Sequence, residues 1–256
     1  MLISVITATF NSEAFIEEAL FSYQEQSYPD KELILIDGKS TDKTLETLKE
    51  YLAIITNLKS EKDKGIYDAL NKGIKLAKGE IIGILHSDDI LASPQVLNKV
   101  AEKFKQDEQL MAVYGDLEYV DRNYPEKVIR FWQSGNFNWR KFANGWMPPH
   151  PTLFIKSTCF KDFGTYDLSF RSAADYDLIL RFLYKNKLKT AYIPEVLVKM
   201  RAGGLSNLSL KNRWRANRED QRAMKNNGIP FPFFTAIIKP LRKLNQYWTK
   251  NNKFIS

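Results

Sequence analysis

The first half of the chain alternates short apolar runs with segments of helical periodicity, and this alternation limits the possible folds more than any other feature. Strands that alternate with helices form a mostly parallel sheet that helices cover on both faces. We therefore predict an α/β protein with a Rossmann-like sheet flanked by helices. The strand-like runs are ISVITATF, ELILID, EIIGIL and MAVYGDLEYV, and the helical patterns between them include NSEAFIEEALFSYQ, STDKTLETLKEYL and IYDALNKGIKLA.

The composition indicates a globular protein from a reducing compartment. The chain has 256 residues and is 44% hydrophobic, which is enough to bury a core. Its single cysteine, Cys159, excludes an internal disulfide. The opening MLISVITATF lacks the basic region and cleavage site of a signal peptide, and no apolar run approaches the roughly 18 residues that span a bilayer. We expect a cytoplasmic protein, either soluble or peripheral on the inner face of the plasma membrane.

The net charge of +8 is concentrated near the C-terminus. Lys211–Ser256 contains 11 basic and 2 acidic residues, whereas the preceding part of the chain contains 27 and 28. This segment also carries Trp, Phe and Ile. Its composition suits binding to an anionic membrane surface, and it equally suits a helix that packs on the domain and exposes a solvated basic face.

Polar side chains gather at the ends of the predicted strands. The carboxyl ends of parallel strands lie at one edge of the sheet, where ligands bind. A helix cap or a loop acid explains any single one of these residues, but their convergence from four strands favours a binding site. They are Thr7, Thr9 and Asn11 after the first strand, Asp37 after the second, Asp63 after the third, and His86, Asp88 and Asp89 after the fourth.

The loop after the first strand limits the ligands that this edge can bind. TATFNSEAF has no glycine, and the chain has no GxxxxGK[ST] motif, so neither a dinucleotide-binding turn nor a P-loop is present. A bound diphosphate then needs a metal that neutralises its charge. The Ser87-Asp88-Asp89 turn offers the oxygen ligands that Mg²⁺ and Mn²⁺ prefer, and we expect a divalent cation to bridge this turn and a diphosphate.

Three stretches, in this order, resemble the inverting family 2 glycosyltransferases of the GT-A fold. The resemblance implies a metal-dependent enzyme that moves a sugar from a nucleotide-sugar, most simply a UDP-sugar, to a hydroxyl of a glycan or lipid-linked acceptor of the cell envelope. It implies a nucleotide-sugar-binding half (1–115) and an acceptor-binding half with the catalytic base (116–210), and the composition adds a basic amphipathic tail (211–256). The stretches are TATFNSEAFIEEALFSYQEQSYPDKELILIDGKSTDKT, SEKDKGIYDALNKGIKLAKGEIIGILHSDD and AADYDLILR.

The resemblance also implies roles for individual donor-site residues. Asp37 accepts the imide hydrogen of uracil, which suits an ionised carboxylate because it only accepts hydrogen bonds. Asp89 binds the metal, while Asp88 contacts the ribose or the donor sugar. Arg201, beside a Gly-Gly loop, helps hold the diphosphate. The further donor-binding candidates are Thr7, Thr9, Asn11, Asp63, Gly65, Asp68 and Asn71. For Asp68 and Asn71, which share one face of a helix, a merely solvated helix face is an equal alternative.

Asp175 is the expected catalytic base. Inverting transfer needs one carboxylate that takes the proton of the attacking hydroxyl, and the resemblance aligns Asp175 with that base. Ala174 stands where the family commonly has Glu. Asp175 and Asp177 are two residues apart, so they cannot face the same way on a helix. The alternative is an ordinary acid in the first turn of a helix, where the macrodipole favours it.

Two residues of the Pro-rich loop WMPPHPTLF are candidates for the acceptor or a phosphate. His150 is a second candidate metal ligand and is equally suited to a structural role. Trp146 offers a ring for a sugar face, although Trp is more often buried by packing.

Two other functions fit parts of the sequence. The basic, aromatic tail suits a nucleic-acid-binding protein, but the acidic sheet edge would repel a phosphate backbone, so no nucleic acid is expected as a partner. A metal-dependent nucleotidyltransferase also uses paired carboxylates, but it would usually have a glycine-rich basic loop after the first strand, which is missing here.

Overall fold

The computed structural model describes residues 1–203 and 210–242. The glycine-rich loop that follows Arg201 lies partly outside the described residues, and so does the last part of the basic tail, from 243 to 256. No helix within the described ranges is long and apolar enough to cross a membrane.

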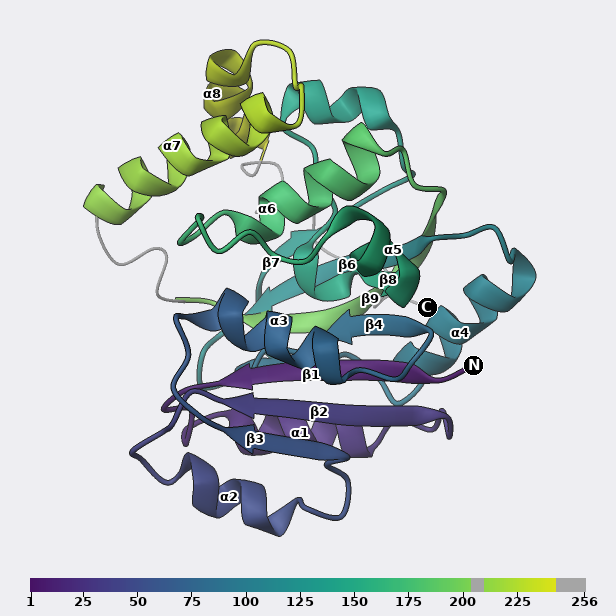
Figure 1. Ribbon diagram of the computed structural model, residues 1–256, viewed down its shortest axis with the longest axis vertical. Helices are drawn as coiled ribbons and strands as arrows, with labels where there is room; N and C mark the ends of the chain where they lie inside the picture. The colour runs from purple at the N-terminus through teal and green to yellow at the C-terminus, as the bar shows by residue number, and fades with distance from the viewer. Residues whose placement is uncertain (204–209, 243–256) are drawn as a thin grey trace.

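Four parallel strands form the first half of the sheet. They lie in the order β3-β2-β1-β4, and their arrows in Figure 1 all point the same way. β1 and β4 are buried along their whole length, as expected for strands that helices cover on both faces. The strands are β1 (Ile3–Thr9), β2 (Lys31–Asp37), β3 (Asn57–Ser60) and β4 (Ile81–Ile84).

Five further strands extend the same sheet, so that the described residues form a nine-stranded sheet in the order β3-β2-β1-β4-β8-β6-β9-β5, with β7 paired to β6. β8 runs antiparallel to both β4 and β6, whereas β6 and β9 are parallel. The sheet is thus mostly parallel and confirms the predicted fold class. These strands are β5 (Asp89–Leu91), β6 (Ala112–Val120), β7 (Val128–Trp132), β8 (Phe154–Lys156) and β9 (Thr190–Arg201).

Helices cover both faces of the sheet, with α3 in front of β1 and β4 and α1 behind the sheet in Figure 1. Two apolar clusters fill the two faces: Ile34 and Ile36 pack on the α3 side, whereas Leu33 and Leu35 pack on the α1 side. The helices are α1 (Ile16–Gln24), α2 (Thr44–Glu50), α3 (Ile66–Leu76), α4 (Val96–Gln106), η1 (Trp139–Asn144), η2 (His150–Thr152), α5 (Ser157–Phe163), α6 (Ala174–Ile179), the π-helical η3 (Leu180–Lys185), α7 (Leu210–Asn226) and α8 (Pro232–Arg242).

Two segments differ from the expected secondary structure. The run IIGILHSDDI is not one strand ending at the acids: β4 ends at Ile84, the chain turns through His86–Asp89, and β5 begins at Asp89 because it pairs with β9 instead. The aromatic stretch after Asp121 is not irregular throughout, since it contains β7 and leads into β8. Pairing with β6 supplies the backbone partners that no local pattern reveals.

The basic segment after residue 210 is a pair of helices that packs on the second half of the domain. Ala223 and Met224 of α7 and Ala236 of α8 are buried in the core cluster on the α3 side of the sheet. In Figure 1 both helices lie beyond α6, at the far end of the molecule from α2. The described part of this segment therefore packs on the domain, as one of the two interpretations of its sequence expected.

Gly73 provides a test of how α3 packs on β1. A Cβ atom at Gly73 would lie 2.3 Å from Cγ2 of Ile6. Gly73→Ala should therefore lower the free energy of unfolding by about 1–3 kcal/mol, although Gly→Ala inside a helix is normally stabilising. Urea denaturation of both proteins measures this change, with the exposed Lys75→Ala on the same helix as the control. A Gly73→Ala variant as stable as the parent would contradict this close packing.

Candidate active site

The carboxyl ends of β1, β2 and β3 bring a row of polar residues together. Thr9, Asp37 and Ser60 are direct neighbours in the strand register. The carboxylate of Asp37 is fully buried and accepts hydrogen bonds from the backbone N–H of Lys39 and from the N–H and hydroxyl of Ser40. It also accepts one from the Ser60 hydroxyl at 2.5 Å. Asp37 thus shapes the loop after β2, and its contact with a base remains a prediction.

Asn11 joins the loops that follow β1 and β2. Its backbone has a positive φ of 49°, which Asn tolerates better than most residues. Its side-chain oxygen accepts a hydrogen bond from Thr41 N at 2.9 Å, and its N–H donates to Ser40 Oγ at 2.9 Å. The two loops therefore form one connected rim, and Asn11 has the location that the sequence predicted for it.

Two predicted donor-site hydroxyls at this edge have no partner among the residues that the structure describes. The buried hydroxyls of Thr7 and Thr9 make no hydrogen bond to any residue that the structure describes. Opposite them, Asp63 accepts a hydrogen bond from Gly65 N, and a Cβ atom at Gly38 would lie only 2.6 Å from Asp63 Oδ2. Gly65 has a φ of 112°, which suits glycine, and begins α3. Unpartnered buried hydroxyls are costly, so this edge is suited to a polar ligand.

Asp88 and Asp89 differ sharply in exposure. Asp89 is 1% exposed, and neither carboxylate oxygen has a partner among the described residues. Burial and the neighbouring Asp88 raise the pKa of Asp89 well above its usual value, and Arg201 opposes this shift. Asp88 is partly exposed. Solvent and ligands therefore meet Asp88 first, with Asp89 behind it.

Arg201 is buried beneath this turn. Its side chain donates to the backbone oxygens of Asp88 (2.8 Å) and Arg122 (2.9 Å) and forms an ion pair with Glu18 at 2.6 Å. The guanidinium also lies over the ring of Phe15. Arg201, at the end of β9, therefore joins the turn that contains Asp88 and Asp89 (the acidic turn) to α1. In this structure Arg201 positions Asp88, and its predicted contact with a diphosphate is untested.

Asp175 begins α6 and faces α3. Its Oδ1 accepts hydrogen bonds from the hydroxyl of Tyr67, at 3.1 Å, and from Tyr176 N, at 2.8 Å. Its Oδ2 accepts none from the described residues, so one oxygen is held and the other is available. Burial, followed by the nearby Asp175, raises the pKa of Tyr67. Tyr67 therefore stays protonated and donates to the carboxylate.

Two histidines and two tyrosines surround this carboxylate. Tyr67 stacks on Tyr166, whose hydroxyl lies 2.7 Å from His150 Nε2. The His150 ring is 5.7 Å from that of His86. Burial lowers the pKa of both histidines, and Asp175 opposes the shift in both cases. His150 and Asp175 thus belong to the same site, with His150 as a neutral imidazole.

The other predicted residues on α3 have structural partners. The Asn71 side chain donates to Tyr166 O and accepts from Tyr166 N, both at 2.9 Å. Asp68 accepts from Lys64 N and pairs with Lys72. These contacts show that Asn71 fastens α3 to Tyr166, which lies between α5 and α6. Tyr67 and Asn71 are separated by one helical turn, a signal that would have identified Tyr67 as a site residue.

Trp146 is buried rather than presented to a ligand. Its indole N–H donates to Ser134 O at 2.9 Å, and its ring packs edge-on against Tyr114, Phe137 and Phe142. With 6% of its surface exposed, it has little area to offer a sugar. Packing, the alternative that the sequence left open, accounts for this residue.

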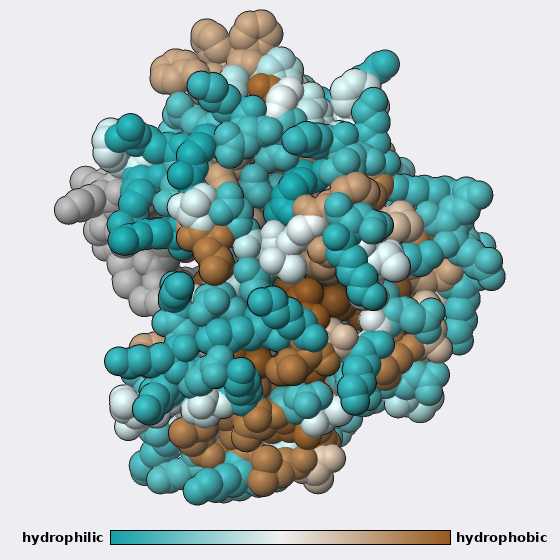
Figure 2. All heavy atoms as spheres, in the orientation of Figure 1, coloured by the Kyte–Doolittle hydropathy of each residue, from teal (hydrophilic) through white to brown (hydrophobic). Residues whose placement is uncertain are grey.

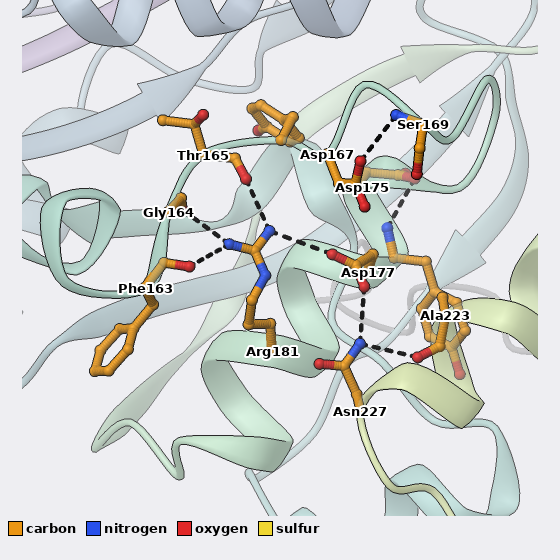
Figure 3. A network of polar contacts seen from close by, with 12 residues as sticks. Phe163, Gly164, Thr165, Asp167, Ser169, Asp175, Asp177, Arg181, Ala223 and Asn227 are labelled. Carbon is orange, nitrogen blue, oxygen red and sulfur yellow. Dashed lines mark hydrogen bonds and ion pairs between the residues drawn. The ribbon is translucent and has the colours of Figure 1, made fainter.

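The helix behind Asp175 is fixed by a polar network (Figure 3). Asp177 accepts hydrogen bonds from Arg181, at 3.2 Å, and from Asn227 after α7, at 2.8 Å. Arg181 also donates to the backbone oxygens of Phe163, Gly164 and Thr165. Asp177 and Asp175 thus face different ways, as their spacing predicted.

Glu219 of α7 holds the loop that leads into α6. Its carboxylate accepts from Arg171 N, Ser172 N and the Ser172 hydroxyl. Burial alone would raise the pKa of Glu219, but these hydrogen bonds lower it. Sequence reasoning missed this role because the contact joins residues 47 positions apart.

A divalent cation fits the acidic turn. Within residues 1–203 and 210–242 no three His, Cys, Asp or Glu side chains are arranged as a complete metal site. Mg²⁺, however, is commonly bound by one or two carboxylates, with substrate phosphates and water completing its shell. The unpartnered oxygens of Asp89 and the partly exposed Asp88 match such a donor set.

GT-A-type glycosyltransferases have a mostly parallel α/β sheet with an acidic turn at its edge. In this chain the carboxylate of Asp175, with one oxygen that accepts no hydrogen bond from the described residues, completes the arrangement. The family model "Glycosyl transferase family 2" matches residues 4–160. A PGL/p-HBAD biosynthesis glycosyltransferase of Mycobacterium tuberculosis is 31% identical over 210 residues, covering 80% of this chain and 79% of the relative. The chain therefore belongs to glycosyltransferase family 2 and is a glycosyltransferase.

Solved structures share the fold. Staphylococcus aureus TarS (1–349) in complex with UDP-GlcNAc superposes with a TM-score of 0.68 at 18% identity, covering 99% of this chain and 74% of that one. The mannosyltransferase PcManGT from Pyrobaculum calidifontis, in complex with GDP-Man and Mn²⁺, has a TM-score of 0.64 at 19% identity, covering 92% and 69%. Family membership decides against the nucleic-acid-binding and nucleotidyltransferase alternatives.

His150 should make stability depend on pH. Burial lowers its pKa from 6.5 to about 4, so between these values the unfolded chain binds a proton that the folded protein does not. The free energy of unfolding therefore falls as the pH drops from 6.5 towards 4, by up to about 3 kcal/mol from this residue. Denaturation at several pH values should show this fall, and His150→Gln should flatten it. An equally steep fall in the His150→Gln variant would show that His150 does not cause this pH dependence.

Proposed function

We propose that the protein is a metal-dependent inverting glycosyltransferase that uses a nucleotide-sugar, with UDP as the nucleotide, and Asp175 as its base. One observation carries the proposal: Asp175 has one carboxylate oxygen held by Tyr67 and the other available, beside the histidines that adjoin the acidic turn. A base needs this arrangement, because it must be oriented and still have a lone pair for the incoming proton.

The donor site is proposed along the carboxyl ends of β1 to β4. The unpartnered hydroxyls of Thr7 and Thr9 and the loop of Asn11 suit a nucleoside, and Asp37 and Asp63 flank the same edge. The similar TarS structure contains UDP-GlcNAc, whereas PcManGT contains GDP-Man. The proposed choice of UDP rests on the family resemblance, because the buried Asp37 carboxylate already accepts hydrogen bonds from Lys39, Ser40 and Ser60. Gly65 and Asp68 lie at the start of α3, next to the proposed site, and Asn71 lies further along the same helix.

The metal is proposed at Asp88 and Asp89. The sequence suggested Asp89 as the ligand, and the exposure of Asp88 adds this second carboxylate on the accessible side. A bound Mn²⁺ or Mg²⁺ supplies charge neutralisation to the leaving diphosphate. Arg201 keeps the turn in place through the Asp88 carbonyl. His150 remains the second candidate ligand through Nδ1, because its Nε2 is occupied by Tyr166.

The chain's own residues then perform a single displacement. Asp175 Oδ2 takes the proton of the acceptor hydroxyl while the oxygen of that hydroxyl bonds to the anomeric carbon from the face opposite the nucleotide. The bond between this carbon and the diphosphate oxygen breaks, the nucleoside diphosphate leaves, and the configuration inverts. Tyr67 holds Oδ1 and orients the carboxylate. Glu219 and Asn227 keep the segment around Asp175 in place from α7. The proposed acceptor is a hydroxyl of a glycan or of a lipid-linked precursor at the cytoplasmic face of the membrane.

Titration of UDP into the protein tests the donor site. With Mn²⁺ present we expect UDP to bind in preference to ADP and GDP, and EDTA to weaken the binding. Asp88→Asn should raise the Mn²⁺ concentration that supports binding by about tenfold or more, because an amide loses a full charge at the metal. Asp30→Asn, at the opposite edge of the sheet, is the control. Absence of nucleotide binding by the parent protein would refute the donor site.

Substitution of Asp175 and Tyr67 tests the base. Asp175→Asn should retain UDP binding and abolish sugar transfer, because the amide cannot take the proton. Tyr67→Phe should lower kcat about tenfold, the worth of a hydrogen bond to a charged group, and leave the KM for the donor unchanged. The matched control is Tyr184→Phe, which removes a hydroxyl that donates to Gly228 O away from the site. Transfer by Asp175→Asn at the parental rate would rule out this base.

A further inference from the structure

Aromatic side chains project from the C-terminal helices into solvent. Phe231, Phe233 and Phe234, at the start of α8, are 75%, 61% and 63% exposed, and Trp214 on α7 is 64% exposed. Figure 2 shows apolar side chains protruding at the end of the molecule where Figure 1 places α8. Single exposed apolar residues are common, but three phenylalanines within four positions form a patch of the kind that marks an interaction site.

A rigid part of the fold presents these rings. Next to them, Thr235 is buried and donates from Oγ1 to Ala143 O at 2.7 Å. Lys239, one turn further on, pairs with Asp220 of α7 at 2.7 Å and lies over the ring of Tyr176. α8 is therefore fixed to η1, α7 and α6. A patch held in this way loses little conformational entropy when it binds.

Positive charges accompany the patch along α7. Trp214, Arg218 and Arg222 follow one another at intervals of four residues, and all three are exposed. They line a groove together with Arg215 and Glu219. Lys225, also exposed, lies in the last turn before the phenylalanines. The carboxylate of Glu219 is occupied by the loop before α6, so the exposed surface of this helix is strongly cationic.

We propose that this surface, defined by Trp214, Arg218, Lys225, Phe231, Phe233 and Phe234, docks on an anionic lipid bilayer. Aromatic rings prefer the boundary between headgroups and acyl chains, and Arg and Lys bind the lipid phosphates above it. The surface offers both chemistries, with the cations along α7 and the rings at the start of α8.

Docking would place the membrane in a defined relation to the active site. α7 carries the cationic face and, through Glu219 and Asn227, holds the segments on either side of Asp175. The lipid surface and the base are therefore connected by one rigid helix. An acceptor with a lipid anchor would approach Asp175 from the side of α7 and α8. The inference thus gives the proposed glycosyltransferase a partner, but it depends on different residues.

Co-sedimentation with vesicles tests the inference on the full chain. We expect binding to phosphatidylcholine vesicles that contain phosphatidylglycerol, weak binding without it, and weaker binding at high salt. The triple variant Phe231→Ser, Phe233→Ser and Phe234→Ser should reduce the partition coefficient about tenfold or more. The double variant Arg218→Gln and Lys225→Gln should reduce only the component of vesicle binding that depends on phosphatidylglycerol. The matched control is Phe21→Ser, a 55% exposed phenylalanine on α1.

The inference would be overturned if the parent protein bound neither kind of vesicle or bound both equally well. It would also be overturned if the triple variant bound as strongly as the parent protein. UDP titration and thermal unfolding of each variant show whether its donor site and fold are intact, so a folding defect is not mistaken for lost docking. The two proposals can also fail separately. Vesicle binding without UDP binding would refute the donor site alone, and UDP binding without vesicle binding would refute the docking surface alone.

Discussion

The parallel pairing of β1 with β2 and β4 is the constraint on which the rest of the structure depends. Because these strands are buried on both faces, their register is determined by apolar packing, and their polar ends are carried to one edge together. Thr9, Asp37 and Ser60 become neighbours only through that register. The donor edge is thus a consequence of how the core is buried.

α3 connects this edge to the carboxylate of Asp175, the proposed base. Its start lies beside Asp63, its Gly73 allows it to pack closely on β1, and its Tyr67 and Asn71 reach across to Asp175 and Tyr166. One helix therefore contacts both the proposed donor edge and the proposed base. Inverting transfer requires a fixed relation between donor and base, and a rigid helix supplies it better than a loop.

The C-terminal helices complete the second half of the domain. Without Glu219 and Asn227 the segments around Asp175 would lose their polar partners, and without Met224 the core on that side would lose a buried side chain. The same helices expose cations and aromatic rings on their outer side. The inner sides of α7 and α8 thus support the domain, whereas their outer sides expose cations and aromatic rings to solvent.

Local periodicity was enough to predict the α/β fold class, the strands β1, β2 and β4, and the opposite orientations of Asp175 and Asp177. The sequence also contained the ordered motifs of the family. It did not reveal that Asp89 lies behind Asp88, that Trp146 is buried or that Arg201 supports the acidic turn.

Which residues meet across the domain depends on long-range packing, and only the folded structure shows it. Tyr67 and Asp175 are separated by 108 positions, and Arg201 and Asp88 by 113. No local pattern encodes such pairs, because they depend on strand order and on the packing of helices against the sheet. Short-range propensity therefore determined the elements of this protein, whereas long-range packing determined its site.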